Sequence, residues 1–247
     1  MKQQYKPLSF LNSNLSLGIN ERKLLNVLIH ELYNKLQEKN DKKNRKTNIG
    51  IQVRKFHIYL SLHRPGKEKF RLSKVMSDLL KKELILSNKN KNPLIHSLQL
   101  TEGNVVFELN PAYNKTISST KVFYIDQDIQ RQITKKNTLF LYELCMSKIT
   151  NLKQLAENKN KIFFEISLNK FLNMLGYEDY KQMRSADLYR TVLTIGAEEL
   201  NRLPSGFKVT IDTVIVRGVF ESFSFKVIID DADYLNKLKT YDKIVYV

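Results

Sequence analysis

The chain has 247 residues, of which 42% are hydrophobic and 10% aromatic, so it is long enough for one large domain or two of about 120 residues, and its composition excludes a disordered chain. The formal net charge of +16 requires a face of strong positive potential, which predicts a polyanionic partner, with nucleic acid favoured over an anionic membrane surface. The first residues lack the apolar stretch of a signal peptide, and no run of about 18 apolar residues could span a membrane. The lone Cys145 excludes an intramolecular disulfide and a cysteine-rich zinc site, which agrees with a reducing compartment. We therefore expect a cytoplasmic protein without a membrane partner.

The first half of the chain predicts a helix, a strand, further helices and a closing hairpin. Leu24, Leu28 and Leu32 lie at helical spacing within residues 20 to 38, with Asn20 as the expected N-cap. A second helix is expected over residues 68 to 84, with an apolar inner side made of Phe70, Leu72, Val75, Met76, Leu79 and Leu80. Strands are expected at residues 49 to 53, 85 to 86, 94 to 100 and 105 to 109, and the apolar run of 56 to 62 fits a strand or a short helix.

The second half repeats this order at an offset of about 115 residues, with residues 122 to 137 as the junction. Asn137 or Thr138 is expected to cap a helix whose apolar stripe, which includes a buried Cys145, extends to Leu155. A strand at 162 to 166 and a short helix ending at Gly176 follow, then a helix over 185 to 203 with Tyr189, Val192, Leu193, Gly196 and Leu200 facing inward. The packed face of the closing hairpin is expected to hold Phe207, Val209, Ile211, Thr213, Ile215, Phe223, Phe225, Val227 and Ile229.

A helix packed on helices and followed by a two-stranded hairpin is the plan of a winged helix, a variant of the helix-turn-helix. We therefore predict an α+β fold of two tandem winged-helix domains, residues 1 to 125 and residues 126 to 247. The first holds 23 Lys and Arg against 9 Asp and Glu, a difference of +14, and the second 18 against 16, a difference of +2. The first domain is therefore expected to supply most of the attraction to the DNA backbone, and the second to supply sequence specificity.

The helix at 185 to 203 is the expected recognition helix, because the major groove of B-DNA admits one helix. Arg184 and Arg190 are expected to read bases, since an arginine can donate two parallel hydrogen bonds to guanine. The DNA-binding residues predicted here, beside Tyr189, are Lys181, Gln182, Arg184, Ser185, Asp187, Arg190 and Thr191. The alternative is that this polar stripe is the ordinary solvated face of an amphipathic helix.

The outer side of the helix near residues 67 to 82 is basic, which suits contacts to phosphates. The residues predicted to bind DNA in the first domain are Lys67, Lys69, Arg71, Lys74, Lys81, Lys89 and Lys91. The alternative is an ordinary lysine-rich surface, since Lys and Asn are abundant throughout the chain.

No motif indicates catalysis. The chain has neither a GxxxxGK[ST] loop nor an HExxH helix, and its four histidines never form the His-hydrophobe-His pair of metal-dependent nicking enzymes. Nothing pairs Glu198 and Glu199 for acid-base work. We therefore expect no enzymatic activity, no metal and no cofactor.

The segment LGYEDYKQMRSADLYRTVLTIGAEELNRL with the hairpin ending FSFKVI, and PLIHSLQLTEGNVVFELNPAYN leading into NTLFLYELC, resemble initiator replication proteins of theta-replicating, iteron-bearing bacterial plasmids. The resemblance covers about residues 20 to 230. It implies two winged-helix domains about a pseudo-twofold axis, a monomer that grips successive major grooves of each origin repeat, and a dimer, formed through the first domain, that represses its own promoter. Melting of the origin and loading of the helicase by host proteins would then follow.

The resemblance places Arg184 and Arg190 at basic positions of the recognition helix and Arg217 at the tip of the wing. The chain departs from the family in two places: MRSADLYRT is less basic than the usual recognition helix, and Val216-Arg217-Gly218-Val219 stands where a basic-Gly-Arg turn is common. These departures put base reading by the second wing in doubt and favour stronger DNA binding by the first domain.

Three functional hypotheses follow. The leading one is a bacterial plasmid initiator that binds repeated duplex sites sequence-specifically, in equilibrium between monomer and homodimer. The second is a transcriptional regulator of the same architecture without a replication role. The third, a DNA-nicking enzyme, is disfavoured because the chain lacks a metal and nucleophile constellation.

Overall fold

The computed structural model describes residues 3–11, 17–41, 50–54, 68–85, 91–110, 113, 121–149, 160–176, 187, 189–217, 219–231 and 233–234. The chain forms two compact units, Met1–Gln132 and Ile133–Val247. Within the described ranges, no helix combines the length and the apolar character needed to cross a membrane.

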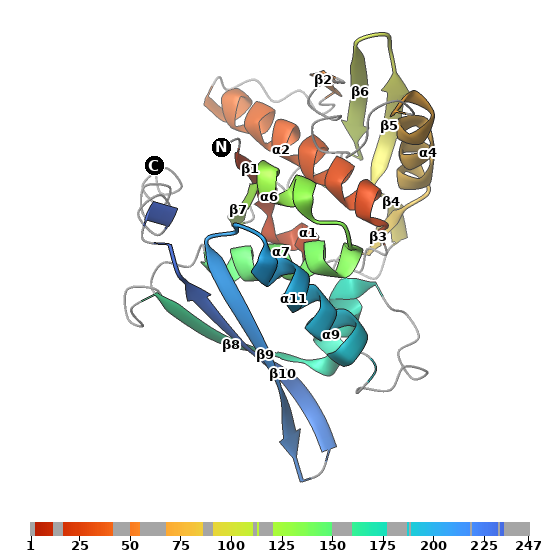
Figure 1. The fold of residues 1–247 in the computed structure, drawn as a ribbon. Helices are drawn as coiled ribbons and strands as arrows, with labels where there is room; N and C mark the ends of the chain where they lie inside the picture. The colour runs from red at the N-terminus through yellow and green to blue at the C-terminus, as the bar shows by residue number, and fades with distance from the viewer. Residues whose placement is uncertain are drawn as a thin grey trace. The chain divides into compact units, whose positions relative to one another are not determined.

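The first unit is built on the long helix α2, which packs against α4 and beside the three-stranded antiparallel sheet β2-β6-β5 (Figure 1). Leu24, Leu28 and Leu32 of α2 are fully buried in its core, as their spacing predicts. The elements of this unit are β1 (Gln3–Pro7), α1 (Leu8–Leu11), α2 (Ile19–Asp41), β2 (Gly50–Arg54), α4 (Glu68–Leu80), β3 (Glu83–Ile85), β4 (Lys91–Pro93), β5 (Ile95–Leu100), β6 (Asn104–Leu109), β7 (Val122–Asp126) and α6 (Gln127–Gln132). The run of residues 56 to 62 lies outside the described residues.

The N-terminus of α2 differs from the prediction. The helix begins at Ile19, so Asn20 is inside its first turn and does not cap it. The N–H of Gly18 instead donates to Oε2 of Glu21 at 2.8 Å, which is one half of a capping box. A glutamate three residues into the helix thus supplies the cap that the sequence assigned to asparagine.

The C-terminus of α4 is earlier than predicted. The helix ends at Leu80, and Glu83–Ile85 form a strand that pairs with β4 instead of a last helical turn. Leu72 and Leu79 are fully buried, but Leu80, expected on the inner side, is 37% exposed. The apolar periodicity therefore identifies the helix correctly but wrongly places Leu80, its last residue, on the inner side.

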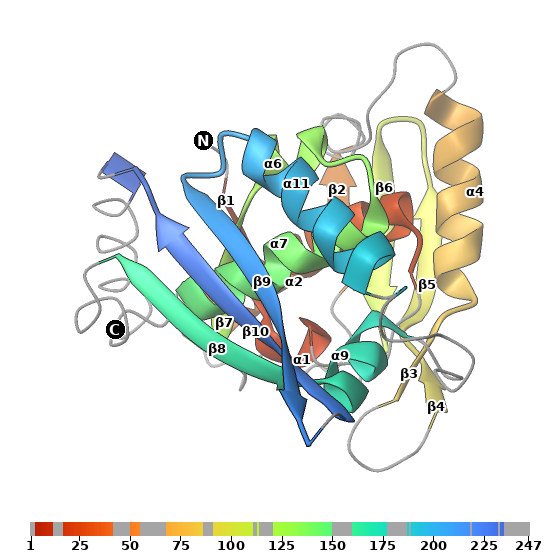
Figure 2. The ribbon, with the colours of Figure 1, turned by 60° about the horizontal axis from the view of Figure 1, so that its bottom comes forward.

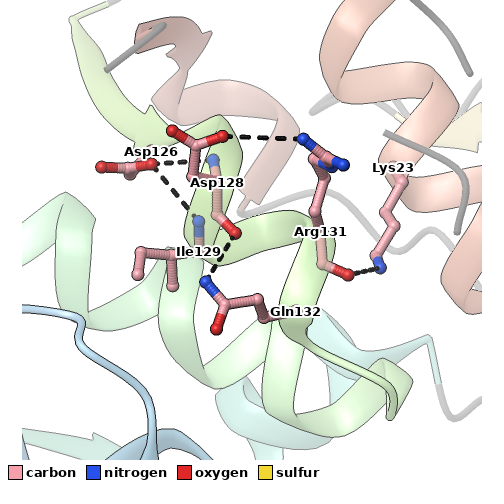
Figure 3. Close-up of polar contacts among 6 residues, drawn as sticks. All are labelled: Lys23, Asp126, Asp128, Ile129, Arg131 and Gln132. Carbon is pink, nitrogen blue, oxygen red and sulfur yellow. Dashed lines mark hydrogen bonds and ion pairs between the residues drawn. The ribbon is translucent and has the colours of Figure 1, made fainter. Parts of the chain in front are cut away.

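The segment of residues 122 to 137, predicted to be a junction, is structured, and its part up to Gln132 belongs to the first unit. β7 pairs antiparallel with β1 from Gln3 opposite Asp126 to Pro7 opposite Val122. α6 follows, and its N-terminus is capped by Asp126, whose Oδ1 accepts from the N–H groups of Asp128 at 2.8 Å and Ile129 at 3.3 Å (Figure 3).

Two side chains of α2 hold α6 at its other end. Nζ of Lys23 donates to the carbonyl of Arg131 at 3.1 Å (Figure 3), a favourable position for a cation at a helix C-terminus. The buried amide of Asn26 donates to Oε1 of Gln130 at 2.6 Å. α6 is attached to α2 in this way and belongs to the first compact unit, Met1–Gln132.

The second unit has the same order of strands as the first. Its sheet is β8-β10-β9, so in both units the strand after the first long helix pairs with the last strand of the hairpin. α7 and α11 lie on one side of this sheet (Figure 2). The elements are α7 (Lys136–Ile149), β8 (Lys161–Ser167), α9 (Leu168–Leu175), the π-helix η3 (Tyr189–Thr194), α11 (Ile195–Arg202), β9 (Phe207–Val216) and β10 (Val219–Ile229). The predicted repetition of the element order is therefore present in the topology.

The helix ends in the second unit are only partly as predicted. Gly176 caps α9 in the left-handed conformation, with φ of 76°, as expected. α7 begins at Lys136, so neither Asn137 nor Thr138 is its cap, and Leu155 lies outside the described residues.

A cluster of phenylalanine rings connects α9 to the sheet. The ring of Phe171 lies 5.2 Å from that of Phe223 and 5.5 Å from that of Phe140 on α7, both edge-on. Phe164 and Phe225 stack across β8 and β10 at 4.7 Å. Aromatic pairs of this geometry add about 0.5 to 1.5 kcal/mol beyond the area that they bury.

Gly206, before β9, is a position where only glycine fits. Its φ is 77°, and a Cβ there would lie 2.5 Å from the ring of Tyr234. We expect Gly206→Ala to lower the free energy of unfolding by about 1 to 3 kcal/mol, because it adds left-handed strain to a clash. Gly103→Ala is the control, since a Cβ at Gly103 meets nothing within 4 Å. Urea denaturation checks both, and equal midpoints would contradict the prediction.

Candidate nucleic-acid interface

The predicted recognition helix is a π-helix that continues into an α-helix. η3 covers six residues, Tyr189–Thr194, and α11 follows without a break. The hydroxyl of Thr194 donates to the carbonyl of Tyr189, five residues earlier, at 3.1 Å. The prediction of a continuous α-helix over residues 185 to 203 is therefore wrong at Tyr189–Thr194, where the described residues form a π-helix.

The inner side of this helix agrees with the prediction. Val192, Leu193 and Leu200 are buried. Gly196 is buried against α7, where a Cβ on this glycine would lie 3.6 Å from the side chain of Leu141. The packing against α7 and β9 therefore follows the apolar stripe, even though the first turn is not α-helical.

Two polar attachments, which the sequence reasoning missed, connect the helix to β9. The hydroxyl of the half-buried Tyr189 donates to the carbonyl of Ile211 at 2.9 Å. At the other end, the amide of Asn201 donates to the carbonyl of Val209 at 2.9 Å and accepts from its N–H at 2.8 Å. An asparagine that replaces a neighbouring strand in this way has no signature in a single sequence.

A third attachment connects α11 to the start of α7. Oε1 of Glu199 accepts from the N–H of Thr134 at 2.8 Å and from its hydroxyl at 2.6 Å, and Oε2 accepts from the hydroxyl of Thr138 at 2.5 Å. Burial opposes ionisation of Glu199, but these hydrogen bonds outweigh it and hold the pKa of the carboxyl below its usual value. Thr138, expected as a helix cap, thus positions the candidate recognition helix.

The outward side of this helix carries part of the predicted DNA-binding set. Asp187 and Arg190 are exposed. Towards the other end, exposed Arg202 pairs with Glu198 at 3.9 Å, one turn away. Thr191 is described by its backbone, and four of the predicted residues lie outside the described ranges: Lys181, Gln182, Arg184 and Ser185.

The hairpin β9–β10 is the wing of this unit, and Arg217 is exposed in its turn with φ of 52°. The alternation of buried and exposed residues follows the prediction up to Ile211 on β9. Beyond it, Thr213 is exposed and Ile215 is 61% exposed, so the expectation that both pack is wrong. β9 is longer than the core is wide, so the side chains after Ile211 have no core residues to pack against and remain at the surface.

In the first unit, α4 presents Ser73, Lys74 and Ser77 to solvent, and Lys81, the residue after its end, is also exposed. Among the described residues, neither Lys74 nor Lys81 forms an ion pair, whereas Lys82 pairs with Glu21 at 3.7 Å. The predicted Lys69, Arg71 and Lys91 are described by their backbones, and Lys67 and Lys89 lie outside the described residues.

The groups best suited to chemistry are placed as follows. Cys145 is buried, as predicted, and burial raises the pKa of its thiol well above the usual range. Burial lowers the pKa of His30 to about 4, and His96 is exposed. His57 and His63 lie outside the described residues, and within the described ones no group of three or more His, Cys, Asp or Glu could hold a metal.

The Glu199 attachment generates a pH-dependent prediction. We expect Glu199→Gln to lower the free energy of unfolding by about 1 to 2 kcal/mol at pH 7, a value discounted for partial exposure. Because the folded pKa lies below the usual 4.5, this stabilisation is complete above pH 4.5 and is lost as the pH falls through the folded pKa. Denaturant unfolding at pH 7 and at about pH 3 should show the two proteins converging.

Glu198→Gln is the matched control, because exposed ion pairs contribute about 0 to 1 kcal/mol. A difference between Glu199→Gln and the parent protein that is the same at both pH values would contradict the assignment.

Comparisons with known proteins support the fold. No model of a protein family matches the chain, and no curated protein matches its sequence. Among solved structures, the Pi initiator protein in complex with iteron DNA is similar over 93% of this chain and 98% of its own, with a TM-score of 0.62 and 14% identity. Domains 2 and 3 of RctB match over 85% of this chain and 81% of theirs, with a TM-score of 0.49 and 9% identity. The chain therefore has the α+β, winged-helix fold of the Pi initiator protein.

Proposed function

We propose that the protein binds repeated duplex sites at a plasmid replication origin and initiates replication from them, without a catalytic step of its own. The observation that carries this proposal is the fold shared along nearly the whole chain with the Pi initiator protein, which was solved in complex with iteron DNA. The net charge of +16 gives the attraction to a polyanion that such binding needs. A protein with this role works in the bacterial cytoplasm.

In this proposal the first unit supplies affinity. Lys74 on α4 and Lys81 just after it are exposed without ion-pair partners among the described residues, so both are available to phosphates. Each cation that neutralises a phosphate releases counterions and makes binding fall with salt. The residues assigned to this role are those predicted from the sequence: Lys67, Lys69, Arg71, Lys74, Lys81, Lys89 and Lys91.

The second unit supplies specificity. Arg190 lies exposed on η3, and η3 is fixed to β9 through Tyr189 and to α7 through its continuation in α11. An arginine held on a rigid element can pair with guanine through two hydrogen bonds. The residues assigned here are Lys181, Gln182, Arg184, Ser185, Asp187, Arg190 and Thr191, with Arg217 on the wing.

We further propose that the first unit forms a homodimer in equilibrium with the monomer, that the dimer represses the promoter of its own gene, and that the monomer brings host initiator and helicase proteins to the opened origin. This part follows from the resemblance to plasmid initiators. Directly repeated sites about two helical turns apart beside the gene would separate this role from that of a transcriptional regulator.

The first experiment is selection of binding sites. We expect the full chain to enrich one motif from a random pool of 30-base-pair duplexes, and to prefer it over a scrambled duplex at 150 mM salt by about 10³-fold or more. We also expect the motif to occur as direct repeats in the plasmid. A pool that remains random after selection would refute the proposal.

The second experiment tests the division of labour. We expect Arg190→Ala to lose about 1 to 3 kcal/mol of discrimination at one base pair, and Lys74→Ala to weaken binding to all sequences and reduce the salt slope by about one. Fluorescence anisotropy at several salt concentrations measures both.

Two exposed residues serve as controls for this experiment: Arg202, which is paired with Glu198, and Lys121, which lies off α4. Equal effects of Arg190→Ala and Lys74→Ala on specificity and on salt slope would contradict the division.

A further inference from the structure

The end of the β9–β10 ribbon extends beyond the three-stranded sheet (Figure 1). β8 pairs with β10 from Ser222 to Ile228, and among the described pairings none joins β8 to Val219 or Phe220. Those two residues pair with Val216 and Ile215 of β9. The last part of the wing is therefore a two-stranded ribbon.

A β-bulge decides which side chains share a face of this ribbon. Phe223 lies opposite Thr213, but the register shifts so that Phe220 lies opposite Ile215. Directly opposed residues point to the same face, and the extra residue, Glu221, brings Phe220 to the face of Phe223. Without the bulge, side chains three positions apart would point to opposite faces.

The bulge makes an apolar ridge that continues from the core. The ring of half-buried Phe220 lies 4.8 Å from that of Phe223, which is fully buried. Ile215 stands across from Phe220 on the same face and is 61% exposed. A single exposed apolar residue is ordinary on a protein surface, but this one is backed by an aromatic ring that is itself fixed to the core.

The ridge lies on the side of the candidate recognition helix. The core face of β9 is the one against which η3 and α11 pack, and the hydroxyl of Tyr189 binds the carbonyl of Ile211, four residues before Ile215. Arg217 follows in the turn, exposed and in the left-handed conformation. The ribbon end thus offers an exposed apolar side chain two residues before an exposed cation, on the strand that the candidate recognition helix contacts.

We propose that the ribbon end enters the minor groove of the bound duplex, where Ile215 wedges into one base step and Arg217 binds in the groove beside it. This inference rests on the proposed function. Apolar side chains inserted from the minor groove unstack a step and kink DNA, and the negative potential of a narrow minor groove attracts arginine. The charge of Arg217 and the continuity with the helix favour duplex DNA over a second copy of the chain as the occupant.

The consequence of such a wedge is local weakening of the duplex at a fixed distance from the bases read by the helix. The energy of unstacking comes from binding at both units, so no nucleotide hydrolysis is needed for this first distortion. The step that yields should be a pyrimidine–purine step, which kinks most easily.

The test compares Ile215→Ser with Val216→Ser. Val216 is the matched control, because it is the next residue of the strand, is 41% exposed and points to the opposite face. The probe is the duplex that the full chain enriches from the random pool, with 2-aminopurine placed at successive positions beside the motif. We expect the parent protein to raise the fluorescence severalfold at one step, and to make a neighbouring thymine reactive to permanganate.

Ile215→Ser should abolish both signals and weaken binding about tenfold, whereas Val216→Ser and the conservative Ile215→Leu should retain them. Because Ile215 is exposed, thermal unfolding of the variants should match that of the parent. Failure to enrich any motif would refute the proposed function itself.

Specific binding without a fluorescence change, or equal effects of the two serine variants, would overturn the wedge and leave the proposed function standing. Loss of a dimer in Ile215→Ser, measured by sedimentation with DNA distortion intact, would instead assign the ridge to a second copy of the chain and also overturn the proposal.

Discussion

The packing of phenylalanine rings around Phe171 fixes how the second unit presents its surface. Phe171 touches Phe140 on α7 as well as Phe223 and Phe225 on β10, so a single side chain of a short helix connects the helical layer to the central strand of the sheet. Since β10 pairs with both of its neighbours, a shift at this point would move the wing and the helices together. Loss of the ring would therefore affect the proposed DNA binding through geometry as well as through stability.

The helix proposed to read DNA packs its apolar side against α7 and β9, and polar contacts fix it further. Tyr189 and Asn201 attach it to β9, and Glu199 attaches it to the start of α7. Each contact reaches a backbone group of β9 or a threonine at the start of α7, and none of them uses Arg190. Rigid support behind an exposed arginine reduces the entropy that binding must overcome.

The sequence is sufficient to predict the plan of each unit, because helical spacing at Leu24 to Leu32 and the left-handed cap at Gly176 are local properties. It does not predict that residues 3–7 pair with residues 122–126, since the first strand is polar and its partner is more than a hundred residues away. The exposure of Ile215 also depends on distant residues. The alternation along β9 shows which face of the sheet Ile215 is on, but whether it is buried depends on how far the core extends along that face. The DNA-binding residues predicted in the first unit come from the charge on one side of a helix, and charge alone does not show where a lysine side chain points.

The π-helical turn at Tyr189–Thr194 has a consequence for how this surface can change over time. Each α-helical residue advances the side-chain direction by about 100°, so inserting or removing one residue in such a turn rotates everything on one side of it relative to the other. Such a change would turn the buried side of α11, with Gly196 and Leu200, by the same angle as its exposed side. The packing of Gly196 against Leu141 therefore fixes the number of residues in this turn, and with it the direction in which Arg190 is presented relative to α11.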